Sequence, residues 1–309
     1  MIFRCLILTF FLSFFHFLRA SEKEHIQVGM YIEMVHGIDY VNGQYEVVFY
    51  LWINSKERVY NVQEEIDIAN SLETEFSNEY IDSSLNGDYH YECKVRAKIL
   101  NHFDIRNYPF DTQTIDLKLE FGNYSIDELS IELDRKHSKI KPERTEGWNS
   151  AVNYFKNGFI NYGSDFGDVN SDESIDYPSI DIKLDLHRNS WNLYFKSFLT
   201  LFLSFILASV SMLYPNDHSE EKIGLIVGSL FTTVGNKYVT DDILPIQNVL
   251  NLSDKLHLLT IFIITLIATY AILEQRFKLK DSVRNDIMAF SFFTILFFGG
   301  IVFFTLGAM

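Results

Sequence analysis

Cysteine is almost absent from the chain, since the 309 residues include only Cys5 and Cys93. Cys5 falls in residues 1–20, which read as a secretory signal peptide with a basic residue, a short apolar core and a small residue at Ala20. The alternative is an extra membrane helix, which the shortness of the apolar core disfavours. A mature chain that starts near Ser21 keeps Cys93 alone, so it cannot form an internal disulfide.

Catalytic and cofactor motifs are missing too. The sequence has no CxxC, HExxH, P-loop or glycine-rich dinucleotide fingerprint after a strand. An enzyme such as a membrane-anchored hydrolase needs a nucleophile, a base and an orienting group. No motif surrounds the scattered histidines at positions 36, 90, 102, 137 and 187. The sequence therefore favours a protein that is not an enzyme and needs no cofactor.

Positive charge is scarce in the first half of the chain. Residues 21–188 hold 32 Asp and Glu against 16 Lys and Arg, whereas residues 189–309 hold 9 against 8. Such an acidic surface repels phosphates, which excludes nucleic acid as a partner. It favours cations as partners, or serves solubility alone.

Residues 21–188 have the pattern of an all-β domain. Segments such as IQVGMYIEM and YEVVFYLWI alternate apolar and polar residues, and Asn42-Gly43 between them is a strong hairpin signal. Further strands are expected at YHYECKVRAKIL, TQTIDLKLEF, LSIEL, AVNYFKNGFINYG and SIDIKLDLH. This spacing predicts an immunoglobulin-like sandwich.

Residues 189–309 predict an all-α domain of four membrane-spanning helices, at 191–213, 223–244, 256–273 and 287–306. The second stretch is unusually polar for a span. It suits a membrane only where water or protein covers one of its faces. The basic loop RFKLKDSVRN, after the third stretch, indicates a cytoplasmic side, which places the β domain and the C-terminus outside a bacterial inner membrane.

The segment FDIRNYPFDTQTIDLKLE, in this order of domains, resembles the signature loop of pentameric ligand-gated ion channels. Further anchors are the hairpin GIDYVNGQYEVVFYLWI, Arg188 before the first helix, and Ile243-Leu244-Pro245 after the second. The two cysteines that close this loop in animal members are absent, so the chain resembles the prokaryotic branch. The resemblance implies a homopentamer.

The resemblance also implies a gating interface where the two domains meet. Pro109 sets the bend of the loop, and Tyr108 and Phe110 form an apolar tip that meets the helices. Matching positions place two carboxylates, Asp39 and Asp111, beside Arg188 in a cluster that transmits movement to the loop around Pro245. The alternative is that these three side chains are solvated at the surface, where ion pairs contribute little to stability. The complete set expected at this interface is Asp39, Tyr108, Pro109, Phe110, Asp111, Arg188 and Pro245.

One face of the second helix is the expected pore lining. Steps of three and four residues align Glu220, Gly224, Gly228, Phe231, Gly235, Tyr238 and Asp242. Rings of Glu220 and Asp242 select cations, and a ring of Phe231 closes the pore by dewetting. The alternative is an ordinary buried helix whose glycines allow neighbouring helices to pack closely against it. Lys237, beside this face, either meets a neighbouring helix or offsets the acidic rings.

The resemblance implies a ligand site between subunits, under the loop GSDFGDVNSDESIDYPS. Tyr162, Phe166 and Tyr177 are the candidate aromatic walls for a cationic amine. Carboxylates in the same loop offer Ca²⁺ ligands, although their spacing is not that of an EF-hand. These residues are Asp165, Asp168, Asp172 and Glu173. Amine, Ca²⁺ and H⁺ all remain candidates as agonist or modulator.

The leading functional prediction is a ligand-gated channel for monovalent cations. A pentameric receptor with little or no conductance is the alternative, because glycines and Phe231 occupy the expected pore face.

Overall fold

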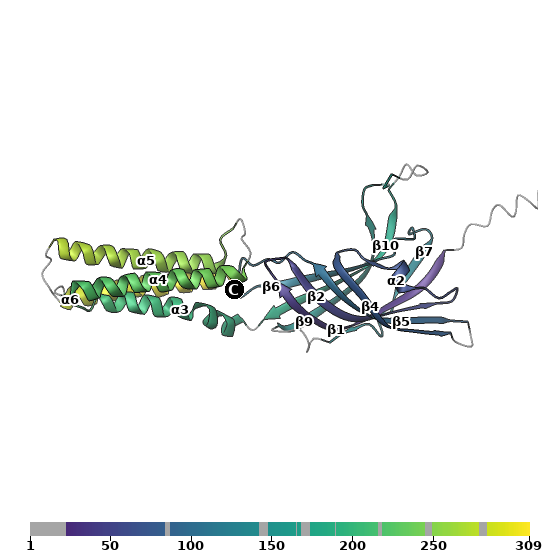
Figure 1. Cartoon of the computed structure of the whole chain (residues 1–309), viewed down its shortest axis with the longest axis horizontal. Helices are drawn as coiled ribbons and strands as arrows, with labels where there is room; N and C mark the ends of the chain where they lie inside the picture. Colours follow the sequence, from purple (N-terminus) through teal and green to yellow (C-terminus); the bar gives the residue numbers. More distant parts are fainter. Residues whose placement is uncertain are drawn as a thin grey trace, which may run out of the picture.

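The computed structural model describes residues 23–83, 87–141, 148–164, 166–167, 174–188, 190–215, 218–244, 249–277 and 283–309. An elongated β domain is followed by a bundle of four long helices (Figure 1). The expected order of an all-β domain and an all-α domain is therefore confirmed. The expected signal peptide, residues 1–20, lies outside the described residues.

The larger sheet has the strand order β4-β5-β2-β1-β7, with β8 paired to β1. These strands are β1 (Glu24–Asp39), β2 (Gln44–Ser55), β4 (Ser71–Ser83), β5 (Tyr89–Leu100), β7 (Leu129–Leu133) and β8 (Lys139–Ile140). The smaller sheet has the order β3-β6-β10-β9. It consists of β3 (Asp67–Ile68), β6 (Thr112–Glu120), β9 (Trp148–Asn161) and β10 (Asp176–Arg188), while α2 (Val62–Glu65) precedes β3.

The core of the β domain forms where the apolar positions of both sheets face each other. Alternation along each strand sends every second side chain inward, and fully buried examples are Phe49 of β2 and Leu186 of β10. The hairpin between β1 and β2 turns at Gly43, whose φ of 62° favours glycine.

The four helices are α3 (Ser190–Ser211), α4 (Ser219–Ile243), α5 (Leu252–Arg276) and α6 (Val283–Leu306). Among the described residues, α3, α5 and residues 284–306 of α6 are long and apolar enough to cross a membrane. The chain therefore has the features of a multi-pass membrane protein. By length and composition α4 does not qualify, in keeping with the polar character expected of the second helix.

The chain leaves the β domain through β10 and enters α3 directly. α6 ends close to the junction of the two domains, so the C-terminus and the β domain lie at the same end of the bundle (Figure 1). The hairpin of β9 and β10 projects away from the sandwich (Figure 1). The fold thus has three places of functional interest: this hairpin, the domain junction and α4.

Candidate functional site

The loop between β5 and β6 forms the tip of the β domain that meets the helices. Gln113, which is 1% exposed, fixes this loop from inside. Its side-chain oxygen accepts a hydrogen bond from the Asp104 backbone nitrogen (3.1 Å), and its Nε2 donates to the Asp104 carbonyl (2.8 Å) and to Asp111 Oδ2 (2.5 Å). A buried amide that satisfies three partners holds the loop in one conformation.

The apolar tip of this loop, Tyr108 and Phe110, contacts α3 and the residue at the end of α4. The Phe110 ring packs on Trp191 (5.1 Å between centroids) and Tyr194 (5.5 Å) of α3. Tyr108 is buried against Leu244, at the end of α4. Pro109 between them is buried and follows a cis peptide bond.

The third contact of the loop is with α5. The Arg106 carbonyl accepts a hydrogen bond from the Leu252 backbone nitrogen (3.1 Å), at the first residue of α5. Asn251 caps the same helix in a capping box with Asp254. One loop of the β domain therefore touches the starts of α3 and α5 and the end of α4.

Arg188, the last residue of β10, lies behind this loop in a cage of aromatic rings. Its NH2 group donates to Asp111 Oδ2 (3.2 Å), and the two side chains are 8% and 2% exposed. The guanidinium carbon lies 4.1 Å from the ring centre of Trp148, 5.1 Å from Tyr108 and 5.5 Å from Tyr40. Cation–π contacts of this kind gain strength when the cation is desolvated.

Burial dominates the electrostatics of this pair. It raises the pKa of Asp111 to about 6 and lowers the pKa of Arg188 to about 10. Both groups still carry charge at pH 7. Within the described residues, Asp111 Oδ1 and Arg188 Nε are buried without a hydrogen-bond partner. The surrounding fold therefore holds this desolvated ion pair at a cost in stability, as is common for charged groups at functional sites.

The predicted contact between Asp39 and Arg188 does not form in the described structure. The Asp39 carboxylate instead accepts from the backbone nitrogens of Val41 (2.9 Å) and Asn42 (3.0 Å), and caps the turn of the first hairpin. These bonds, chiefly the one from Asn42, hold the pKa of Asp39 below its usual value. Its neighbour Tyr40 reaches Arg188, since the guanidinium donates to the Tyr40 hydroxyl. Pro245, expected at this interface, lies outside the described residues.

Within one chain, the whole expected pore face of α4 is exposed. The rings of Phe231 and Tyr238 are each 74% exposed. An added Cβ on the three glycines would meet no atom within 4 Å, so these glycines make no close helix contact in the chain. The exposed set is Glu220, Gly224, Gly228, Phe231, Gly235, Tyr238 and Asp242.

The opposite face of α4 is buried and bonded to its neighbours. Ser204 of α3 contacts the Thr233 hydroxyl and donates to the Ser229 carbonyl (both 2.5 Å). Lys237 donates to Asp254 of α5 (2.6 Å) and to Asp241. Lys237 therefore meets a neighbouring helix, one of the two roles left open by the sequence.

The three candidate ligand-binding aromatics lie together where β9 ends and β10 begins. The Tyr162 ring is 5.4 Å from Phe166 and 6.1 Å from Tyr177, between centroids. Tyr162 donates to Glu120 Oε2 (2.6 Å), and Glu120 is only 4% exposed. Burial, and then this bond, raise the pKa of Tyr162 to about 12. Phe166 remains 68% exposed, so the cluster is open to solvent.

Glu120 is the residue of this cluster that sequence reasoning missed. It ends β6, where the alternating pattern assigns it to the outer, solvent-facing side. Tyr162, from a segment far along the chain, covers it there. A carboxylate bonded to the central ring of an aromatic cluster is chemically suited to a small organic cation.

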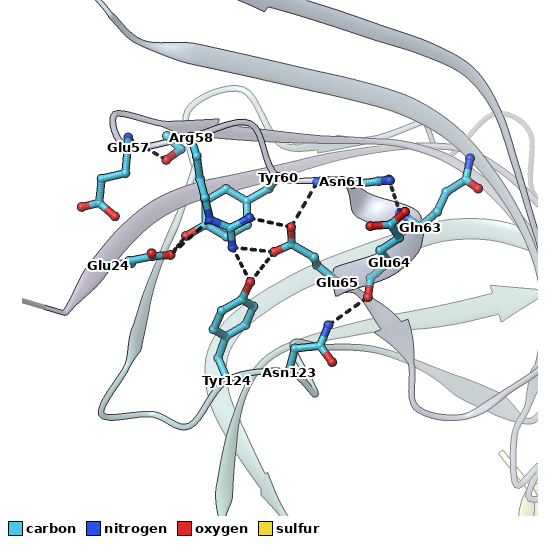
Figure 2. A network of polar contacts seen from close by, with 11 residues as sticks. Glu24, Glu57, Arg58, Tyr60, Asn61, Gln63, Glu64, Glu65, Asn123 and Tyr124 are labelled. Carbon is cyan, nitrogen blue, oxygen red and sulfur yellow. Dashed lines mark hydrogen bonds and ion pairs between the residues drawn. The ribbon is translucent and has the colours of Figure 1, made fainter. Parts of the chain in front are cut away.

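A second polar network surrounds Arg58 and Glu65 (Figure 2). Arg58 bonds both oxygens of Glu65 (2.9 and 3.0 Å) and stacks on Tyr60 (4.1 Å from guanidinium carbon to ring centre). Tyr124 donates to Glu65 (2.6 Å) and also contacts Arg58 (Figure 2). Glu24, at the start of β1, accepts from Tyr60.

This network reaches the aromatic cluster through the backbone. Tyr124 lies in the turn after β6, and the flanking nitrogens of Phe121 and Ile126 donate to the carbonyls of Pro178 (3.0 Å) and Asp176 (2.9 Å). Those carbonyls flank Tyr177. The Arg58 network therefore fixes the turn that positions one wall of the cluster.

The candidate Ca²⁺ ligands Asp165, Asp168, Asp172 and Glu173 lie outside the described residues. Among the residues that the structure describes, no group of three or more His, Cys, Asp or Glu side chains is arranged to hold a metal ion. No protein-family model matches the chain, and no curated protein matches it either.

Proposed function

We propose that the chain is one subunit of a homopentameric, ligand-gated channel for monovalent cations. Ligand binds at the β domain, and the junction transmits its effect to a pore lined by α4. The proposal treats the helical domain as membrane-embedded, with the β domain outside the cell.

The observation that carries the proposal is the exposed polar face of α4. This face has carboxylates at both ends, with three glycines, Phe231 and Tyr238 between them, and one chain leaves it uncovered. Such a face is costly against lipid but stable against water. Five copies around an axis turn it into a water-filled path, with Glu220 and Asp242 as acidic rings that select cations.

The domain junction supports the gating part of the proposal. The loop between β5 and β6 contacts three helices, and the buried Arg188–Asp111 pair joins it to the last strand. A displacement of β10 is passed to α4 through Tyr108 and Leu244, because closely packed contacts move as a unit.

The ligand is a small cation in the most direct version of this proposal. Tyr162, Phe166 and Tyr177 supply the aromatic faces, and Glu120 supplies the charge. Protons are a second candidate stimulus, since the pKa of Asp111 lies near 6. Ca²⁺ is a third, through the acidic loop of residues 165–173.

The test is voltage-clamp recording from cells that express the full chain. External pH, external Ca²⁺ and a panel of small amines are stepped in turn, with Glu220→Gln in parallel. We expect a stimulus-dependent current whose cation selectivity falls in Glu220→Gln. A current with unchanged selectivity in that variant contradicts the assignment of α4 as the pore lining.

A second candidate function is a pentameric receptor with little or no conductance. Phe231 favours it, because five large exposed rings at mid-helix form a wide apolar barrier to ions. Surface-expressed wild-type protein that gives no current, together with a silent Phe231→Ala variant, supports this candidate over the channel.

A further inference from the structure

The helical domain holds a buried histidine whose two ring nitrogens both face hydrogen-bond acceptors. His257 of α5 is 1% exposed. Its Nδ1 lies 2.7 Å from the backbone carbonyl of Ser253, one turn earlier in the same helix. Its Nε2 lies 3.1 Å from Oδ1 of Asn236 in α4. A neutral imidazole carries one proton, so it can donate to only one of these oxygens.

The short contact to Ser253 decides which nitrogen carries that proton. A backbone carbonyl can only accept, so Nδ1 is the donor, and the neutral ring turns the lone pair of Nε2 toward the Asn236 oxygen. The Ser253 hydroxyl is farther from Nδ1, at 3.3 Å.

The amide of Asn236 is held in this orientation from its other side. Its Nδ2 donates to the Ser197 carbonyl of α3 (3.3 Å). Turning the amide over would give Nε2 of His257 a donor, but would set the amide oxygen against the Ser197 carbonyl. With a neutral ring, one contact between two acceptors therefore remains in either orientation, and a second proton on the ring removes it.

The charges around His257 favour that second proton. Lys237 and Asp241 of α4 and Asp254 of α5 act on the ring electrostatically. Lys237 donates to both carboxylates, so the three side chains form one cluster. Together they carry one positive and two negative charges, and a protonated His257 makes the group neutral. Ionisable side chains at such a depth in a membrane domain mark functional positions.

The other elements around His257 add no charge beside it. From α3 the Phe198 ring packs against the imidazole (6.3 Å between centroids), whereas the charged residue of that helix, Lys196, is exposed. The charged residues of α6, Arg284 and Asp286, lie near its start, at the end of the bundle far from the β domain (Figure 1). Arg106, in the loop between β5 and β6, is exposed and pairs with Asp104.

The position of this site connects it to the domain junction. Asn236 lies about two turns before the end of α4, where Leu244 packs against Tyr108. His257 lies in the second turn of α5, whose first residue, Leu252, bonds the loop between β5 and β6. A proton on Nε2 replaces the contact between acceptors by a charge-assisted hydrogen bond, which ties α3, α4 and α5 together just below the junction.

We propose that His257 is a proton-binding site of the helical domain, at which a proton taken up on Nε2 bonds Asn236 and locks α4 to α3 and α5. The proton comes from water, and the N–H bond is the only covalent bond that forms. This site is separate from the aromatic cluster, from Asp111 and from the exposed face of α4. The inference therefore goes beyond the proposed channel, and its test needs no current.

The test is thermal unfolding of the full chain in detergent, followed by tryptophan fluorescence from pH 4 to pH 8. Each variant is compared with wild type at the same pH, so that groups titrating in both proteins cancel. Asn236→Leu removes the acceptor, and His257→Phe removes the proton site. We expect the Tm deficit of each variant to be roughly 2–4 °C larger at pH 4 than at pH 8, because only the protonated ring bonds Asn236.

Asn236→Asp distinguishes a proton site from a structural contact. It keeps an acceptor opposite Nε2 and adds a negative charge, so the ring should hold its proton to higher pH. Measured against Asn236→Leu, the midpoint of the pH-dependent gain in Tm should lie about one pH unit or more higher in Asn236→Asp than in wild type. A structural role alone would leave that midpoint where it is.

Thr260→Val is the matched control. Thr260 lies one turn after His257, is fully buried, and donates to the Leu256 carbonyl of its own helix (2.7 Å). The variant removes a buried hydroxyl without changing the contacts of His257 or Asn236, so its Tm difference from wild type should be the same at every pH.

The outcomes separate this inference from the proposed function. A Tm deficit that does not change with pH, in either Asn236→Leu or His257→Phe, overturns the proton site, and so does an unchanged midpoint in Asn236→Asp. If one variant fails to fold, the other two decide the question. A chain that gives no current overturns the channel and leaves the proton site standing, whereas a helical domain without this pH response leaves the channel standing.

Discussion

Loss of the Arg188 guanidinium should destabilise the domain junction strongly, and in a pH-dependent way. Arg188→Gln leaves the Asp111 carboxylate buried without its cation. Breaking a buried pair from one side costs about 3–5 kcal/mol, because the remaining charge is uncompensated. Asp111→Asn leaves the Arg188 guanidinium without its anion in the same way. Its net cost should be smaller, because it also removes a carboxyl whose pKa burial has raised by about two units, which is about 3 kcal/mol against its charged form.

The pH dependence follows from the direction of the Asp111 shift. Its folded-state pKa of about 6 lies above its ordinary value of 3.8, so the folded protein binds this proton more tightly than the unfolded chain. The contribution of Asp111 to stability is therefore greatest below about pH 4 and is lost as pH rises through about 6. At pH 5 the Asp111 carboxyl is mostly neutral, so Arg188→Gln leaves little unpaired charge in the junction. The loss of stability relative to wild type should therefore be large at pH 8 and small at pH 5.

Tryptophan fluorescence during thermal unfolding is a suitable assay, because Trp148 touches Arg188 and Trp191 touches Phe110. At pH 8 we expect the Tm of Arg188→Gln to fall by roughly 10 °C. The double variant Asp111→Asn/Arg188→Gln should recover most of that loss. Equal deficits at pH 5 and pH 8, or no recovery in the double variant, would refute the assignment of the cost to an unpaired carboxylate.

Three further predictions follow from local geometry. Phe231→Ala removes the widest apolar ring of the α4 face and should produce a basal current in voltage clamp; silence in a surface-expressed variant contradicts the gate. Gly29→Ala places a Cβ 2.2 Å from the Trp52 ring and should cost about 1–3 kcal/mol by chemical denaturation, whereas Gly224→Ala meets open space and should be neutral. Arg58→Lys loses the two-point contact with Glu65 and should lower the free energy of unfolding by about 1–3 kcal/mol. Arg135→Lys, at an exposed position, should not change it measurably.

The strands with one buried face were predictable, because alternation from Ile26 to Ile32 or from Tyr45 to Ile53 leaves a single assignment of faces. β4 was missed for the converse reason. It is an edge strand with glutamates at positions 73, 75 and 79, and most of its residues are exposed. Because few of its residues are buried, its sequence lacks the alternation of apolar and polar residues by which the other strands were recognised.

The candidate site was predictable where helical or turn geometry is local. The face of α4 follows from steps of three and four, and the tip at Tyr108 and Phe110 follows from Pro109. Contacts between distant segments were not predictable. The partner that reaches Arg188 from the first hairpin is Tyr40 rather than Asp39, because Asp39 can satisfy its carboxylate within its own turn. Asn236 and His257 lie 21 residues apart on two helices, and neither has a local pattern that names the other.

The chemistry of the chain allows a direct test of the proposed water-filled face on α4. Cys93 is buried, and burial raises the pKa of its thiol to about 12, so this residue should give almost no background with thiol reagents. A cysteine at Gly228 lies on the exposed face, and one at the adjacent Ser229 lies on the buried face.

Both variants can be labelled with a membrane-impermeant, cationic thiol reagent in reconstituted liposomes, with mass spectrometry as the readout. A pore lined by α4 predicts rapid, near-complete labelling of Gly228→Cys and slow labelling of Ser229→Cys. Lipid or protein against that face would instead leave Gly228→Cys as unreactive as Ser229→Cys, and that result would contradict the channel.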